Sequence, residues 1–426
     1  MHMSPPPERH RSGPEPSGPL AADATVVVVG ASLAGLRAAE TLRSDGLTGP
    51  IVMVGAESHR PYDRPPLSKQ FLAGTWERDR VALRPDAKLE ALGLDLRLGC
   101  TATALDVGEQ TVHLADGTAL EYDGLVVATG ASPRHLPGTD GHRAVHVLRT
   151  LDDAIALAAV AVPGTRMVVV GGGFIGAEVA ATCSARGMSV TIVEALPAPL
   201  ARALGPDIGA ACAGLHTDHG VTVLTGTGVA GIDQPGGPGD APARVHLTTG
   251  QDLDADVVVV GIGVTPATRW LTGSGLELDD GVRVDEGLFA ADRVVAAGDI
   301  ARWDDPRSPR PVRLEHWTNA AEQGVHAARN LLRGRPAALA FRPVPYVWSD
   351  QYDVKIQVIG FPGPDDDVTI VDGTGSLDER RFVALYAKAG QLTGAVGFGR
   401  PRQLMAYHRL LETGTSLADA LAATSS

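Results

Sequence analysis

Two short glycine motifs are the first residues in this sequence whose types and spacing could do chemistry. Gly30–Gly35 reads G-x-S-x-x-G, and Gly171–Gly176 reads G-x-G-x-x-G. In such a turn the first glycine makes the tight bend, the second position lets a pyrophosphate approach the backbone, and the third packs a helix against a strand. Free N–H groups at the helix N-terminus then bind the phosphate oxygens. Both motifs therefore predict dinucleotide sites, with a plain turn as the alternative for the first.

An acidic residue follows each motif where a ribose ligand is expected. Glu57 lies 22 residues beyond Gly35, and Glu194 ends the strand that follows the second motif. A carboxylate at this place accepts hydrogen bonds from an adenosine 2′-hydroxyl and repels a 2′-phosphate. NADPH sites place an arginine nearby instead, and the nearest one downstream of Glu194 is Arg202. The second motif is therefore interpreted as a site for NADH.

The elements that must position these motifs follow one order, which is strand, glycine turn, helix, strand. The ranges expected for the strand, helix and second strand are Val26–Val29, Leu36–Arg43 and Ile51–Val54 for the first motif, and Met167–Val170, Ala177–Arg186 and Ser189–Val193 for the second.

A repeat extends beyond the glycines. Val112–Gly117 resembles Val245–Gly250, and the strand Leu125–Gly130 resembles Val258–Gly263, with a constant offset of 133 residues. Two similar α/β halves therefore follow one another in the chain.

Beyond residue 263 the pattern changes. Val294–Ala297 is a strand that ends at Gly298 and Asp299, and Leu314–Leu332 contains a helix. From about residue 337 a block of strands followed by helices is expected. Its strands are Val354–Ile359, Val368–Val371, Phe382–Lys388 and Leu392–Val396, and its helices are Arg402–Glu412 and Ser416–Ala423.

Composition excludes several classes of protein. The 426 residues predict about three domains, and 44% hydrophobic residues suffice for several cores. Glycine is in excess at 51 residues. The net charge of −13 argues against general nucleic-acid binding. The longest apolar run, Ala154–Val162, is too short to span a bilayer. Residues 1–23 are rich in proline and lack an apolar signal core, so a disordered leader is expected.

The three cysteines are far apart in the chain. Cys100, Cys183 and Cys212 form no C-x-x-C and no Cys/His cluster, so no metal site and no disulfide framework is expected. Each is most simply a small buried hydrophobe. This usage fits a reducing, cytoplasmic location.

Two dinucleotide sites in one chain imply two cofactors, and the economical pair is FAD with a nicotinamide. The sequence resembles the NADH-dependent ferredoxin reductases of oxygenase systems, the putidaredoxin-reductase and rhodocoxin-reductase type. The resemblance runs from about Thr25 to about Leu421. The stretches that carry it are Val27–Arg43, Arg60–Lys69 (R-P-Y-D-R-P-P-L-S-K), Gly171–Glu178, Ala297–Asp299, Glu315–Trp317 and Tyr346–Tyr352 (Y-V-W-S-D-Q-Y).

The resemblance implies an α/β fold of two Rossmann-like domains, the second inserted in the first, with a C-terminal α+β domain. The FAD-binding domain would span 24–133 and 264–336, the NADH-binding domain 134–263, and the C-terminal domain 337–426. The predicted FAD site comprises Gly30, Ser32, Ala34, Gly35, Glu57, Arg64, Lys69, Ala102, Thr129, Gly130, Arg149, Asp299, Trp317 and Trp348. The predicted NADH site comprises Gly171, Gly173, Phe174, Ile175, Gly176, Glu194 and Gly263.

Lys69 and Glu178 are the predicted catalytic residues. By the resemblance they pair, and the Lys69 ammonium lies near flavin N5, where it favours the reduced, anionic flavin. The alternatives are a solvated lysine at a helix start, with Ser68 as a cap, and an exposed glutamate stabilised by the helix dipole. Trp317 and Trp348 would cover the isoalloxazine, or else be ordinary core or interface aromatics.

The absence of cysteine between residues 1 and 99 distinguishes this chain from other members of the same fold. Flavin oxidases and peroxidases carry a redox cysteine near Lys69, and disulfide reductases carry a dithiol there. Electrons must therefore leave the flavin directly, which suits a one-electron acceptor.

The resemblance makes that acceptor a 2Fe–2S ferredoxin that docks transiently and serves a cytochrome P450 or a ring-hydroxylating oxygenase. Residues 300–410 carry 15 Lys/Arg against 12 Asp/Glu, a charge of +3 that could steer an acidic ferredoxin or be an ordinary surface. The other hypotheses are a rubredoxin reductase or NADH oxidase of the same fold, and an NADH-responsive flavoprotein like apoptosis-inducing factor.

Overall fold

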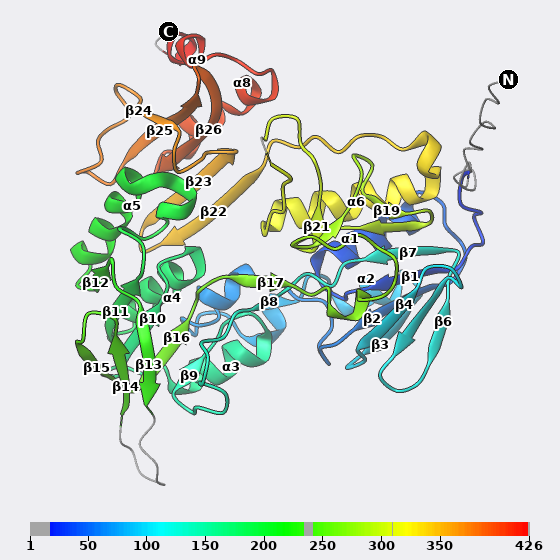
Figure 1. Ribbon diagram of the computed structural model, residues 1–426, viewed down its shortest axis with the longest axis horizontal. Coiled ribbons are helices and arrows are strands. Elements are labelled where there is room, and N and C mark those ends of the chain that lie inside the picture. The colour runs from blue at the N-terminus through cyan, green and yellow to red at the C-terminus, as the bar shows by residue number, and fades with distance from the viewer. Residues whose placement is uncertain (1–17, 234–241, 309, 425–426) are drawn as a thin grey trace, which may run out of the picture.

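The computed structural model describes residues 18–233, 242–308 and 310–424 (Figure 1). Most of the expected leader lies outside these residues. Its end does not behave as a leader, because the Leu20 N–H donates to the Leu332 carbonyl at 2.9 Å and the Leu20 side chain packs against the hydrophobic core.

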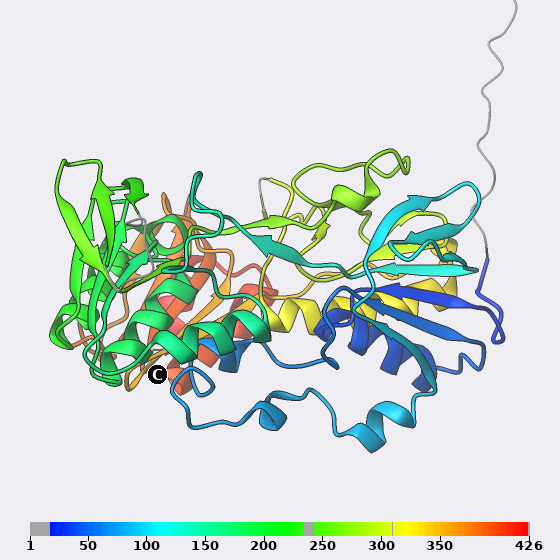
Figure 2. The ribbon, with the colours of Figure 1, turned by 90° about the horizontal axis from the view of Figure 1, so that it is seen from below.

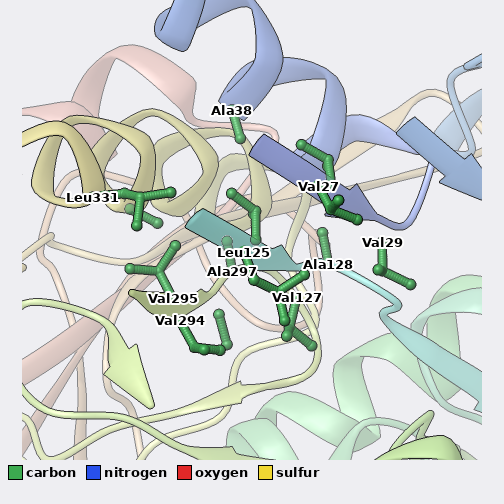
Figure 3. Packing of buried hydrophobic residues seen from close by; sticks show 14 of the residues in the cluster. Val27, Val29, Ala38, Leu125, Val127, Ala128, Val294, Val295, Ala297 and Leu331 are labelled. Atoms are coloured by element: carbon green, nitrogen blue, oxygen red, sulfur yellow. The ribbon is translucent and has the colours of Figure 1, made fainter. Parts of the chain in front are cut away.

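A six-stranded sheet forms one end of the elongated molecule (Figure 1). It is parallel except for the edge strand β19. Its order is β19 (Phe289–Ala291), β20 (Val294–Ala296), β7 (Gly124–Val127), β1 (Val26–Val29), β2 (Ile51–Gly55) and β3 (Leu94–Leu98). The strand β1 is buried along its whole length, as a continuous valine run in the middle of a parallel sheet requires. Figure 3 shows Val27, Leu125 and Val295 of three of these strands in one hydrophobic cluster with Ala38 and Leu331.

Helices α1 (Leu33–Ser44) and α6 (Trp317–Arg333) lie side by side against this sheet (Figure 2). A Cβ atom added to Gly324 of α6 would come within 2.4 Å of the Ala34 carbonyl oxygen of α1. Only glycine therefore allows this helix pair to approach so closely.

A five-stranded, fully parallel sheet forms the other end. Its order is β12 (Thr222–Thr225), β11 (Ser189–Glu194), β10 (Arg166–Val170), β16 (Val257–Val260) and β9 (Val145–His146). The helices of this half are α3 (Leu151–Val160), α4 (Phe174–Ala185) and α5 (Ala201–Asp218).

The predicted internal repeat is confirmed, because each half also carries a three-stranded antiparallel sheet. These sheets are β4 (Ala102–Asp106), β5 (Thr111–Leu114) and β6 (Ala119–Glu121), and β13 (Val229–Asp233), β14 (Ala243–Leu247) and β15 (Asp252–Ala255). Two chain segments that cross between the halves, β8 (Ala131–Pro133) and β17 (Val264–Pro266), pair with each other (Figure 1).

Several short elements complete this part of the chain. They are β18 (Val282–Arg283), β21 (Ala301–Arg302) and α2 (Asp86–Glu90), with the 3-10 turns η1 (Pro65–Ser68), η2 (Arg78–Val81), η3 (Arg269–Leu271) and η4 (Arg335–Ala337).

Both helices that follow a glycine motif begin three residues earlier than predicted. Helix α1 starts at Leu33 and α4 at Phe174, so the third glycine of each motif lies inside the first turn. A Cβ atom at Gly35 would lie 1.9 Å from the Gly30 carbonyl oxygen, which shows why glycine is needed within the helix. The predicted helices began only after the third glycine of each motif.

The C-terminal sheet is wholly antiparallel. Its order is β22 (Tyr346–Gln351), β23 (Val354–Gly360), β26 (Gln391–Phe398), β25 (Phe382–Lys388) and β24 (Asp367–Ile370). The last helices are α7 (Pro401–Met405), α8 (His408–Glu412) and α9 (Leu417–Thr424). The single helix predicted over 402–412 is therefore wrong, since α7 and α8 are separate.

Strand β22 was not predicted, and its burial pattern explains why. Its two fully buried side chains are polar, Ser349 and Gln351, whereas Trp348 is partly exposed. In a half-buried strand the buried side chains are usually hydrophobic and the exposed ones polar. In β22 the buried side chains are polar, so the usual sequence signal is reversed.

The C-terminal sheet shares a hydrophobic core with α5, which belongs to the second half of the chain (Figure 1). Leu204, Ile208 and Leu215 of α5 are among its buried residues, and the Tyr386 hydroxyl donates to the Leu204 carbonyl at 2.7 Å. His216 lies in the same contact, fully buried, 3.0 Å from the Tyr352 hydroxyl. No helix among the described residues is long and apolar enough to cross a membrane.

Burial lowers the pKa of His216 to about 4. Between that value and the ordinary pKa near 6.5 the unfolded chain binds a proton that the folded chain excludes, so stability falls as the pH falls. We expect acidification from pH 7 to pH 5 to cost about 2 kcal/mol of unfolding free energy through His216. Urea unfolding of the protein and of His216→Asn at both pH values measures it. Equal losses in the two proteins would contradict this account.

Candidate active site

A buried ion pair links the two halves of the chain. The Lys69 ammonium, just after η1, lies 2.6 Å from Oε2 of Glu178 on α4. The side chains are 11% and 3% exposed, respectively. The alternatives of a solvated lysine and an exposed glutamate are therefore wrong.

The Glu178 carboxylate accepts two further hydrogen bonds. The Ser68 hydroxyl donates to Oε2 at 2.5 Å, and the Ser349 hydroxyl of β22 donates to Oε1 at 2.7 Å. Ser68 therefore serves the carboxylate instead of capping a helix. Sequence reasoning missed Ser349, although it lies inside the Y-V-W-S-D-Q-Y stretch.

A second polar network connects Glu57 to Asp299. The Tyr62 hydroxyl donates to Glu57 at 2.5 Å, and Arg64 forms an ion pair with Glu57 at 2.7 Å. Arg64 also donates to the backbone carbonyl of Arg149, whose guanidinium lies 2.8 Å from the Asp299 carboxylate. Burial raises the pKa of Tyr62, so its hydroxyl stays a donor at any ordinary pH.

The first glycine turn leaves no room for side chains. A Cβ atom on Gly30, where φ is +122°, would lie 2.1 Å from the Ala128 carbonyl oxygen. Ser32 precedes α1 at its N-cap, and its hydroxyl makes no capping hydrogen bond. No described side chain caps this helix N-terminus, and the first-turn N–H groups of a helix have no partner within the helix.

The second glycine turn repeats this geometry. Cβ atoms on Gly171 and Gly176 would lie 2.5 Å from the Gly261 oxygen and 2.1 Å from the Gly171 oxygen. The Glu194 carboxylate reaches back over the turn and accepts the Gly172 N–H at 2.7 Å. It therefore stands at the glycine turn, where a ribose ligand of a nucleotide is expected.

Two buried nitrogen atoms without hydrogen-bond partners in the described part of the chain indicate that these residues fit FAD. Arg149 Nε and His316 Nδ1 are buried and have no hydrogen-bond partner among the described residues. Burial lowers the pKa of His316 to about 4, so its imidazole is neutral. FAD would bring phosphate and carbonyl oxygens for the Arg149 donor, and hydroxyl groups that can pair with either tautomer of His316. The unpartnered atoms belong to residues beside Asp299 and Trp317, where the sequence placed the cofactor.

An aromatic cluster lies at the junction with the C-terminal sheet. The rings of Trp317 and Trp348 are 6.0 Å apart at 68°, and Tyr346 stacks on Trp348 at 5.9 Å. The Trp317 indole N–H donates to Asp63 at 2.6 Å, and burial raises the pKa of Asp63. Trp317 is 37% exposed and is therefore not a core aromatic. Sequence reasoning missed Asp63.

The other predicted site residues fall into two groups. Ala34 and Ala102 are buried in the first hydrophobic core, and the Thr129 hydroxyl donates to the Ala267 carbonyl at 3.1 Å. Gly130 and Gly263 follow strands and have positive φ angles of +67° and +99°. Gly173 is the N-cap of α4, and Phe174 and the exposed Ile175 lie in the first turn of that helix.

Comparison with known proteins identifies the family of this chain. The model of the pyridine nucleotide-disulphide oxidoreductase family matches residues 24–324, and the reductase C-terminal model matches residues 346–426. The chain belongs to the pyridine nucleotide-disulphide oxidoreductase family. This family binds FAD and NAD(H). The predicted fold class is confirmed.

Similar members of this family are ferredoxin reductases by name. Rhodocoxin reductase of Rhodococcus erythropolis is 37% identical over 94% of this chain and 92% of its own length. The anthranilate 1,2-dioxygenase system ferredoxin–NAD(+) reductase component of Burkholderia cepacia is 40% identical over 91% and 94%. The reductase in the covalent putidaredoxin reductase–putidaredoxin complex is 33% identical, with a TM-score of 0.87 over 92% of this chain and 94% of that one. The predicted resemblance is confirmed.

Two glycine-to-alanine substitutions in the second glycine turn form a matched pair. We expect Gly176→Ala to lower the free energy of unfolding by about 1–3 kcal/mol, because its methyl group would overlap backbone. Gly173→Ala meets no protein atom closer than 4.0 Å, so it should keep the stability and weaken NADH binding instead. Thermal unfolding and NADH titration separate the two effects. Equal stability of both variants would contradict the packing argument.

Proposed function

We propose that this protein is an FAD-containing NADH:ferredoxin oxidoreductase, whose 2Fe–2S ferredoxin serves a cytochrome P450 or a ring-hydroxylating oxygenase. The buried Lys69–Glu178 pair, which joins the two halves of the chain, carries the proposal. By the resemblance, thiol-dependent proteins of the same fold have their redox cysteine near Lys69. The names of the relatives support ferredoxin as the acceptor. FAD, when bound, supplies the exchange between a two-electron donor and a one-electron acceptor.

The first half of the chain would hold FAD. The α1 N-terminus at Gly30 and Ser32 would bind its pyrophosphate, and Glu57 would accept from a ribose hydroxyl while Arg64 orients it. Asp299, set by Arg149, would bind the ribityl or phosphate region. This assignment places the FAD-binding domain at 24–133 and 264–336.

The second half would hold NADH within residues 134–263. The α4 N-terminus would bind the pyrophosphate of NADH, and Glu194 would accept from the adenosine ribose. Glu194 is held by the N–H groups of Gly172 and Leu196, at 2.7 and 2.8 Å, so its charge is fixed where a 2′-phosphate would be repelled. This arrangement supports NADH over NADPH.

Lys69 would stabilise the negative charge of the reduced flavin. Its ammonium is fixed by Glu178 and by the Pro65 carbonyl at 3.1 Å, so it requires little reorganisation. The C-terminal block at 337–426 would form the interface with the ferredoxin, and the basic character of residues 300–410 would steer an acidic partner. A cytoplasmic location fits three cysteines that form no disulfide among the described residues.

Turnover with added ferredoxins tests the acceptor. We expect NADH to reduce the holoprotein anaerobically and a panel of 2Fe–2S ferredoxins to accelerate NADH oxidation, with the effect declining as salt rises. Rubredoxin is the matched alternative acceptor, and peroxide formation in air measures oxidase activity. Acceleration by rubredoxin alone, or rapid peroxide formation without ferredoxin dependence, would overturn the proposal.

Lys69→Met tests the ion pair. Removing the ammonium should make the flavin midpoint potential more negative and slow flavin reduction by NADH roughly ten-fold or more, because a fixed positive charge is lost. Lys88→Met is the control, since Lys88 is exposed on α2. Potentiometry and stopped-flow absorbance give both quantities, and FAD content shows that the variant is loaded. A potential and rate equal to those of Lys88→Met would refute the role of Lys69.

A further inference from the structure

A line of buried hydrogen bonds continues from Glu178 into the C-terminal sheet and α5. Ser349 donates to Glu178, the Gln351 amide donates to the Ser349 hydroxyl at 3.2 Å, and the Cys212 thiol donates to the Gln351 carbonyl at 3.5 Å. Ser349, Gln351 and Cys212 are 0% exposed. Such a line of polar groups inside a protein is costly unless each member is paired.

The donors and acceptors in this line permit one direction only. Burial raises the pKa of the Cys212 thiol to about 12, so Cys212 keeps its hydrogen and donates to the Gln351 oxygen. The Gln351 amide then presents its N–H to Ser349. The Ser349 hydroxyl already accepts from Gln351, and its single hydrogen therefore points to the Glu178 carboxylate. The direction of the Ser349 hydrogen is therefore set by Gln351 of β22 and Cys212 of α5, and not by Lys69.

The geometry of β22 explains how one strand serves both this line and the aromatic cluster. Side chains alternate between the two faces of a strand. Ser349 and Gln351 share the face toward Glu178 and Cys212, while Tyr346 and Trp348 stack on the other face. Beyond the strand, Tyr352 adopts a positive φ of 55° and stacks on His219 of the second half at 3.7 Å. The end of β22 is therefore anchored to the chain that follows α5.

We propose that Ser349, oriented by Gln351, is a positioning residue that fixes the Glu178 carboxylate and thereby sets how strongly Glu178 neutralises Lys69. The C-terminal sheet would then help to tune the flavin in addition to covering it. This inference rests on the proposed function, because it concerns the charge beside the bound FAD. A hydrogen bond from Ser349 withdraws electron density from the carboxylate, and its loss would strengthen the hold of Glu178 on Lys69.

Three variants of the FAD-loaded protein test the inference. Ser349→Ala removes the hydroxyl, Ser349→Thr keeps it, and Thr374→Val removes another buried hydroxyl of the C-terminal block, one that bonds only backbone. We expect Ser349→Ala to make the flavin midpoint potential more negative and to lower the limiting rate of reduction by NADH about three-fold or more. The KM for NADH should change less than two-fold, and Ser349→Thr should restore both properties.

The controls separate this inference from the proposed function. Thr374→Val should lower stability but leave the potential and the reduction rate unchanged. If Ser349→Ala matches Thr374→Val in potential and rate while wild type is reduced by NADH, the inference is overturned and the proposed function stands. If wild type itself is not reduced by NADH, the proposed function fails first. If Ser349→Ala does not bind FAD, Gln351→Leu gives the same comparison, because it keeps the Ser349 hydroxyl and removes the donor that orients it, together with the acceptor of the Cys212 thiol.

Discussion

The buried carboxylate of Glu178 is the constraint on which the rest of the site depends. A charge removed from water is tolerated only when it is paired and fully hydrogen-bonded, and removing a partner from such a pair typically costs about 3–5 kcal/mol. Its donors come from Ser68 and Lys69 in the first half of the chain and from Ser349 in the C-terminal sheet, while Glu178 itself lies in the second half. One carboxylate therefore fixes three parts of the molecule relative to each other.

The surrounding architecture brings these three parts together. The glycine turns place both helix N-termini at the carboxyl ends of parallel strands. Open α/β sheets bind their ligands at this edge. The hydrophobic core shared by α5 and the C-terminal sheet holds β22 against α4. Because β22 has one polar and one aromatic face, it contacts the ion pair through Ser349 and Trp317 of α6 through Trp348.

Much of this fold could be predicted from the sequence, because its signals are local. Valine runs, glycine spacing and the 133-residue repeat identify both parallel sheets, and the resemblance pairs Lys69 with Glu178. Strand β22 could not be found by periodicity, since its buried residues are Ser349 and Gln351. The network from Glu57 through Arg64 to Arg149 joins residues up to 92 positions apart, which no local pattern reveals. Helix starts were misplaced because glycine, usually a breaker, is required inside the first turn at Gly35 and Gly176.

We infer that electrons leave FAD without passing through a protein thiol, because the three cysteines of the described residues form no disulfide and Lys69 is paired with Glu178. Burial raises the pKa of both Cys183 and Cys212 to about 12, which leaves neither of them as a reactive thiolate. Cys100 is only partly buried, so the expectation of a buried cysteine is wrong there, but desolvation and the neighbouring Asp116 raise its pKa as well. Anaerobic titration of the holoprotein with NADH tests this inference. We expect complete bleaching of the flavin absorbance at one NADH per FAD. A second equivalent taken up before bleaching is complete, or a thiolate–flavin charge-transfer band during the titration, would contradict it.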